Sequence, residues 1–167
     1  DMTRDGEMRT RDWLDLVLAN IGDETDSWGV TKIPASTALA VNFYSDPAAR
    51  DDQRARWETG LAGLLADAEP GSDHQLTFAR SLAAAAISPE ALDAIEELLA
   101  GSRVVAGLEV DQDLRWVLIT ALARAGRFTD TEIDAELTRD TTISGQESAA
   151  AARVAQPTAE AKAAGWS

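Results

Sequence analysis

The sequence contains no cysteine and only one histidine, His74. Without cysteine the chain has neither a disulfide framework nor a thiolate nucleophile. One histidine cannot supply the nitrogen and sulfur ligands of a usual zinc site. A serine–histidine–aspartate nucleophile would need His74, but this residue follows G-S-D at a helix start and no serine occupies a strained strand-to-helix turn. We therefore expect no catalytic residue, no metal and no cofactor in residues 1–167, and expect His74 to bond locally or to pack against a neighbouring helix.

Long apolar runs and basic patches are also missing. No stretch approaches the 18 apolar residues of a membrane-spanning helix, and no secretory signal is visible. The chain has 29 acidic and 15 basic residues, a net charge of −14, so phosphate repulsion would oppose binding to nucleic acid. We expect a cytoplasmic protein with no membrane or nucleic-acid partner. Because the chain begins with Asp1 rather than methionine, we also expect it to be a fragment of a longer chain.

Neither phosphate-binding loops nor calcium loops are present. The glycines are scattered helix stops, and no predicted strand precedes them. Acidic residues cluster at 23–26, 111–113 and 130–136, but without the ligand spacing and turning glycine of a calcium loop. Carboxylates in the first turn of a helix are already favoured by the helix dipole. We interpret these clusters as helix starts on an acidic surface, with attraction of cationic ligands as the alternative.

The clearest positive feature is the segment from Asp111 to Ala125, closed by Gly126. Aspartate is a good helix N-cap, and glycine suits the left-handed residue that ends a helix. Two apolar stripes at helical spacing run between them: Leu114, Leu118, Ala121, Leu122 and Ala125, and Trp116, Ile119 and Ala123. A surface helix needs one apolar face, so this helix is predicted to pack between neighbours on two sides.

Helical patterns cover most of the remaining chain, and we find no convincing strand. Within 24–44, Pro34 predicts a kink or break with helix on both sides, and Gly29 adds doubt about the local geometry. Residues 102–110 are predicted to form an extended connection. A capping box of Ser144 and Glu147 predicts the start of an alanine-rich helix. The other predicted helices span 10–21, 47–68, 75–86, 88–99, 129–137 and 159–166.

Predicted caps recur at Thr10, Asp46, Ser88 and Thr129, every 36 to 42 residues, with one pair of helices per period. Two-helix repeats of about 40 residues stack side by side as a solenoid. We therefore predict an all-α fold of eight or nine helices that forms one helical-repeat domain over 1–167. A compact helical bundle is the alternative.

Aromatic and basic side chains provide the remaining candidates for a site. The five tryptophans (Trp13, Trp28, Trp57, Trp116 and Trp166) lie on five different predicted helices, so inter-helix packing is favoured over a ligand cage. Arg115 lies beside Trp116 on a largely apolar helix, and we expect it to pair with a carboxylate or to face a cavity.

Several segments, taken together and in order, carry a resemblance to a known family. They are E-P-G-S-D-H-Q-L-T-F-A-R (69–80), D-Q-D-L-R-W-V-L (111–118), I-D-A-E-L-T-R-D-T-T (133–142) and A-R-V-A-Q-P-T-A-E-A-K-A (152–163). The match begins at D-M-T-R-D-G-E (1–7) and runs to the last residues. The sequence resembles the C-terminal domain of bacterial aminopeptidase N, a zinc metallopeptidase of the gluzincin class, and the corresponding domain of the endoplasmic-reticulum aminopeptidases.

The resemblance implies a right-handed superhelix of HEAT-like antiparallel helix pairs that covers the catalytic cleft and controls substrate access. The zinc of such enzymes is bound by an H-E-x-x-H helix in an upstream catalytic domain, and this sequence lacks that motif. The implied partners are therefore the upstream catalytic domain and the peptide substrates of the parent enzyme. His74, Arg115 and Trp116 are candidates to face the substrate chamber or another domain. A free-standing helical-repeat adaptor that binds a protein partner is the alternative function.

Overall fold

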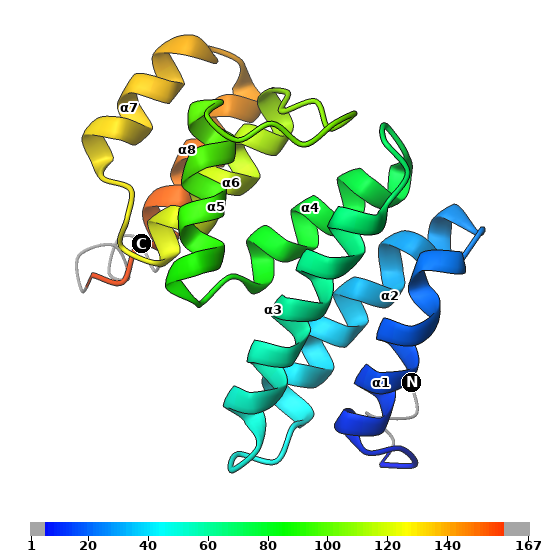
Figure 1. The fold of residues 1–167 in the computed structure, drawn as a ribbon. Helices are drawn as coiled ribbons and strands as arrows, with labels where there is room; N and C mark the ends of the chain where they lie inside the picture. Colours follow the sequence, from blue (N-terminus) through cyan, green and yellow to red (C-terminus); the bar gives the residue numbers. More distant parts are fainter. Residues whose placement is uncertain (1–5, 159–167) are drawn as a thin grey trace. The chain divides into compact units, whose positions relative to one another are not determined.

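The computed structural model describes residues 6–158, except for the side chain of Ser27. These residues form eight α-helices and no strand (Figure 1), which confirms the all-α prediction. A 3₁₀ turn at Ile21–Asp23 follows the first helix, and a π-helical segment at Ala40–Tyr44 follows the second. None of the described helices is long and apolar enough to cross a membrane. The helices are α1 Thr10–Asn20, α2 Ser27–Leu39, α3 Arg50–Asp67, α4 Asp73–Ala85, α5 Pro89–Ala100, α6 Gln112–Arg124, α7 Asp130–Arg139 and α8 Ile143–Ala155.

The chain divides into two compact units. The N-terminal unit comprises α1 to α4 with residues up to Ser88, together with the short segment Val105–Leu108. The C-terminal unit comprises α5 to α8 in Pro89–Val104 and in the residues from Glu109 onward. The right-handed superhelix and the single domain over 1–167 stay predictions.

The core of the N-terminal unit is built around α3. Its stripe of Trp57, Leu61 and Leu65 is buried against Leu14 and Val17 of α1 and against Phe78 and Leu82 of α4. A Cβ at Gly60 would lie 2.4 Å from Leu18 Cδ2, so the glycine permits the close approach of α1 and α3. The large apolar residues of α3 therefore face the core, although Leu64 is only partly buried.

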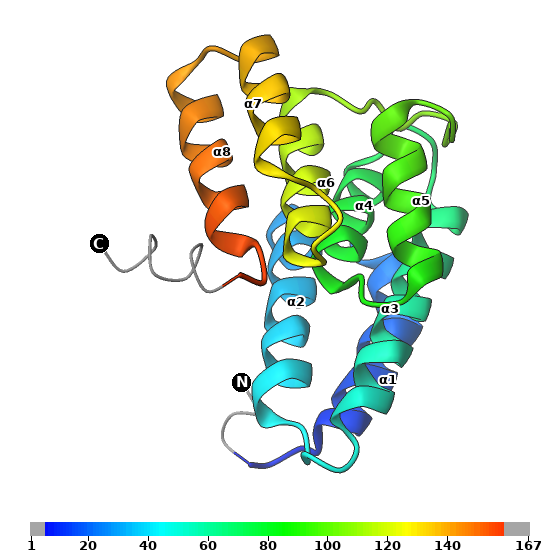
Figure 2. The same cartoon turned by 90° about the vertical axis from the view of Figure 1, so that its left-hand side faces the viewer.

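The core of the C-terminal unit is built around α6, which contacts α5 and α8. Figure 2 shows α8 lying beside α6 and α7. Both predicted stripes of α6 are buried except at Ala125, which confirms the packing of this helix between neighbours. The second stripe packs against Ile133 of α7 and against Ala149 and Ala152 of α8, whose small side chains allow close contact.

Several predicted helix ends are confirmed. Asp111 Oδ1 accepts a hydrogen bond from the backbone N–H of Leu114 at 2.8 Å. Gly126 has φ of +74°, the left-handed conformation expected after a helix. The predicted cap Thr129 forms a capping box with Glu132 at the start of α7. Ser72 caps α4. The connection at 102–110 contains no helix, as predicted.

Three predicted caps are wrong. Thr10 is the first residue of α1 and is buried, while the preceding Arg9 takes the extended N-cap conformation. The carboxylate of Asp46 accepts from Ala48 N in a separate turn, and α3 begins only at Arg50. Thr142 rather than Ser144 caps α8, because its hydroxyl accepts from Gly145 N at 3.0 Å.

At Pro34 we predicted a kink or break with helix on both sides. Helix is present on both sides, but the chain does not break, because α2 continues through this residue. Proline lacks the N–H that would bond to the carbonyl one turn earlier, yet tertiary contacts hold the helix. The buried Thr37 hydroxyl donates to Ile33 O at 2.8 Å and accepts from Trp13 Nε1 of α1 at 3.0 Å. Gly29 lies in the first turn of α2, where Asp26 caps its N–H. The predicted last helix, 159–166, lies outside the described residues.

Candidate functional site

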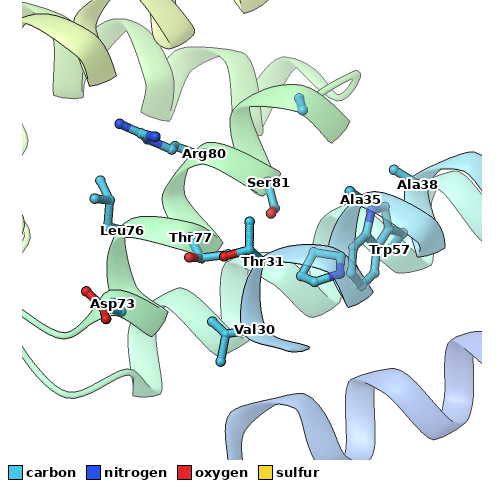
Figure 3. Close-up of a pocket in the computed structure, with 12 residues that line it drawn as sticks. Val30, Thr31, Ala35, Ala38, Trp57, Asp73, Leu76, Thr77, Arg80 and Ser81 are labelled. Carbon is cyan, nitrogen blue, oxygen red and sulfur yellow. The ribbon is translucent and has the colours of Figure 1, made fainter. Parts of the chain in front are cut away.

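A pocket of about 440 Å³ lies in the N-terminal unit between α2 and α4 (Figure 3). This volume falls in the usual range of small-ligand sites. The wall from α2 is small and apolar, formed mainly by Pro34, Ala35 and Ala38. The buried indole of Trp57 on α3 contributes a further apolar surface. The pocket exists because α2 continues past Pro34 and lines it on both sides of that residue.

The wall from α4 is polar. Asp73, Thr77, Arg80 and Ser81 are spaced at i, i+4, i+7 and i+8, so they share one side of the helix. Arg80 and Asp73 are exposed, whereas Thr77 and Ser81 are half-buried. Figure 3 shows the two hydroxyl side chains pointing toward α2, with Asp73 and Arg80 farther out along α4. The arrangement offers one negative group, one positive group and hydroxyls above an apolar surface.

His74 lines a second pocket of the N-terminal unit, of about 370 Å³. Its ring packs edge to face on Phe78 one turn later, with centroids 5.6 Å apart. The Nε2 atom is buried and has no hydrogen-bond partner among the described residues. Asp23, Asp67 and Glu69 also line this pocket, which gives it an acidic rim. We predicted that His74 bonds locally or packs against a neighbouring helix, whereas its ring contact with Phe78 lies within α4 itself.

Arg115 pairs with a carboxylate, as expected. Its Nε and Nη2 donate to the two oxygens of Glu136 at 2.7 and 2.6 Å, and its Nη1 donates to Leu99 O at 3.1 Å. The Glu136 side chain is only 5% exposed and also accepts from Gln112 Nε2 at 2.9 Å. The hydrogen bonds from Arg115 lower the pKa of Glu136, and the same carboxylate raises the pKa of Arg115. This bidentate pair ties α6 to α7.

Trp116 also makes a buried polar contact, since its Nε1 donates to Asp140 Oδ2 at 2.8 Å. The other oxygen of Asp140 accepts from the hydroxyl and the N–H of Thr142 at 2.6 and 3.2 Å. Hydrogen bonds from Thr142 and then from Trp116 lower the pKa of Asp140. Gly145 approaches this group so closely that a Cβ would lie 2.5 Å from Asp140 O. Arg115 and Trp116 therefore make two polar contacts from α6, one to α7 and one to the turn before α8.

The other tryptophans follow the packing prediction only in part. Trp57 is buried, and the half-buried Trp13 bonds to Thr37 of α2. Trp28 is 69% exposed and does not pack between helices, which contradicts the prediction for this residue. Trp28 lies in the first turn of α2. Trp166 lies outside the described residues.

Metal-ligating side chains do not gather within residues 6–158. No group of three or more histidine, aspartate or glutamate side chains in this range could hold a metal ion.

The α2–α4 pocket was not predicted from the sequence. A signal was present, since the polar positions 73, 77, 80 and 81 recur at helical spacing beside the apolar stripe of the same helix. Periodicity shows which residues share a face of α4 but not which helix lies opposite.

Comparison with known proteins covers the whole chain. The family model described as the ERAP1-like C-terminal domain matches residues 1–167. The chain is 47% identical over 166 residues to a protein of Streptomyces lividans named aminopeptidase N. The aligned region is 99% of this chain but 19% of that relative, so the chain spans about a fifth of the length of the protein it matches.

Proposed function

Because the chain belongs to the ERAP1-like C-terminal domain family, we propose that it is the C-terminal helical domain of a zinc-dependent aminopeptidase. The longer enzyme removes N-terminal amino acids from peptides. The observation that carries this proposal is the alignment of nearly the whole chain with a small part of a protein named aminopeptidase N. The chain has one histidine and its described residues form no ligand group, so it does not fit a zinc site itself. Zinc and the hydrolytic residues belong to the upstream catalytic domain in this proposal.

The domain is non-catalytic, covers the catalytic cleft and controls which peptides enter. Exposed apolar side chains support a contact with the rest of the longer enzyme. Trp28 on α2 and Phe43 in the π-helical segment are 69% and 71% exposed, and Leu39 and Tyr44 are also exposed. Leu39, Phe43 and Tyr44 lie together in residues 39–44, the apolar segment, and exposed apolar side chains gathered in this way mark interaction surfaces. Of the candidates from the sequence, His74 and Arg115 keep part of their surface accessible, whereas Trp116 is buried and would support its helix.

The test uses the 167-residue chain and an S. lividans aminopeptidase N truncated before the aligned region. Hydrolysis of an amino-acid anilide, a short peptide and a long peptide is measured with zinc for each protein alone and for their mixture. We expect no hydrolysis by the chain alone, binding to the truncated enzyme, and a change in its preference between short and long peptides.

Two variants identify the contact surface. Phe43→Ser is expected to weaken binding to the truncated enzyme, because it removes an exposed ring from the apolar segment. Val104→Ser is the control, since Val104 is 84% exposed but lies outside that segment. Zinc-dependent hydrolysis by the chain alone would contradict the non-catalytic role. Failure to bind the truncated enzyme would instead favour a free-standing adaptor.

A further inference from the structure

Arg80 differs from the other arginines in the described residues. Each of the others from Arg9 to Arg153 has a hydrogen bond or an ion pair. Arg80 has no such partner within residues 6–158, although the chain carries 29 acidic residues. An unpaired guanidinium at the edge of a pocket is free to bind the carboxylate of a ligand.

Asp73 provides the opposite charge on the same side of α4. It has no hydrogen-bond or ion-pair partner for its carboxylate in the part of the chain that the structure describes. The seven residues from Asp73 to Arg80 correspond to about 10 Å along the helix axis. Figure 3 shows Leu76 between these two side chains. A ligand lying along α4 would meet a negative group, an apolar group and a positive group in that order.

Hydroxyl groups lie beside this line. Thr77 and Ser81 are half-buried, and neither side chain makes a hydrogen bond to another described residue. They can therefore bond to the amide groups of a ligand. The apolar wall from Pro34, Ala38 and Trp57 can accept a side chain.

From these observations we propose that the α2–α4 pocket binds a peptide of about three residues with both ends free. Its ammonium group pairs with Asp73, its carboxylate pairs with Arg80, and its central side chain packs near Leu76. An extended tripeptide is about 10 Å long, which matches the rise of about 10 Å along α4 between Asp73 and Arg80. The pocket by itself predicts a ligand that carries one positive and one negative group. That this ligand is a peptide rests on the proposed function.

Other small ligands fit the two charges less well. A single amino acid is too short to reach both groups. A phosphate would meet Arg80 but would be repelled by Asp73. A longer peptide could pair with only one of the two groups while it lies along α4. The binding site therefore selects for length as well as for charge.

The first test is calorimetric titration of the 167-residue chain with Ala-Leu-Ala. We expect N-acetylation or C-amidation to weaken binding by about tenfold each, because each change removes one charge-assisted contact. Free alanine and a free hexapeptide are expected to bind more weakly than the tripeptide. Equal affinity for the free and the blocked tripeptides, or no binding of the free one, would overturn the proposal. These ligand comparisons need no variant and so do not depend on how a variant folds.

The second test uses variants whose helical content is checked by circular dichroism. In Arg80→Gln the free and the amidated tripeptide should bind equally, and in Asp73→Asn the free and the acetylated tripeptide should bind equally. Arg103→Gln and Asp51→Asn are matched controls, because they change an exposed arginine and an exposed first-turn aspartate outside the pocket. If Arg80→Gln still bound the free tripeptide more tightly than the amidated one, the proposed contact of Arg80 with the peptide carboxylate would be contradicted. Because no hydrolysis is measured, failure of binding would leave the proposed function standing.

Discussion

At the scale of single residues, the ion pair between Arg115 and Glu136 gives the sharpest prediction. Glu136→Gln leaves Arg115, whose side chain is 17% exposed, without its charged partner. Hydrogen bonds to charged groups contribute about 1.5–3 kcal/mol, so we expect the free energy of unfolding to fall by about 2 kcal/mol. Urea unfolding at pH 7 measures this loss.

The control for that variant is Glu97→Gln, because Glu97 pairs with Arg103 on the surface, where both side chains are about half exposed. Exposed ion pairs contribute about 0–1 kcal/mol. The folded-state pKa of Glu136 is lowered, so its stabilisation is complete above the ordinary value of 4.5 and is lost as pH falls through the lower folded-state pKa. The stability of Glu136→Gln should therefore fall less between pH 5 and acid than that of the native chain. Equal losses for the two variants at pH 7 would contradict a special role for Arg115 and Glu136.

At the scale of helices, the structure and the sequence prediction disagree on the N-cap of α8, which is Thr142 in the structure and Ser144 in the prediction. Thr142→Ala removes the hydroxyl that caps Gly145 N and donates to Asp140. Loss of an N-cap costs about 1 kcal/mol, and we expect at least that decrease in the free energy of unfolding. Ser144→Ala is the matched control, because Ser144 is exposed and does not cap α8, so its effect should stay within about 0.5 kcal/mol. Both decreases are measured by urea unfolding. A larger decrease for Ser144→Ala than for Thr142→Ala would support the predicted capping box of Ser144 and Glu147 instead.

The helix boundaries show which structural features nearby residues alone can predict. Asp111, Gly126 and Thr129 were identified correctly, because each cap acts on backbone groups within a few residues. The prediction failed at Ser144 because Thr142 is tied to Asp140, which in turn is fixed by Trp116 from another helix. Local patterns cannot rank two adjacent capping residues when a distant side chain stabilises one of them.

At the scale of the whole molecule, the net charge of −14 predicts a response to salt. Excess like charge destabilises a folded chain through self-repulsion, and added salt screens it. We expect the melting temperature at pH 7 to rise between low and moderate sodium chloride. Potassium chloride should give the same rise, because screening depends on ionic strength. A fall in both salts would show that the surface ion pairs, such as Arg127 with Asp93, outweigh the repulsion.

The sequence by itself determined the all-α fold and the two-sided burial of α6, and it predicted that Arg115 either pairs with a carboxylate or faces a cavity. Helical periodicity and the cost of burying an unpaired charge are local properties, so they can be inferred from residue order. Only the tertiary structure decided that α2 continues through Pro34 and that its small side chains line one pocket with polar residues of α4. These features depend on contacts between helices far apart in the chain, and residue order alone does not determine which faces meet.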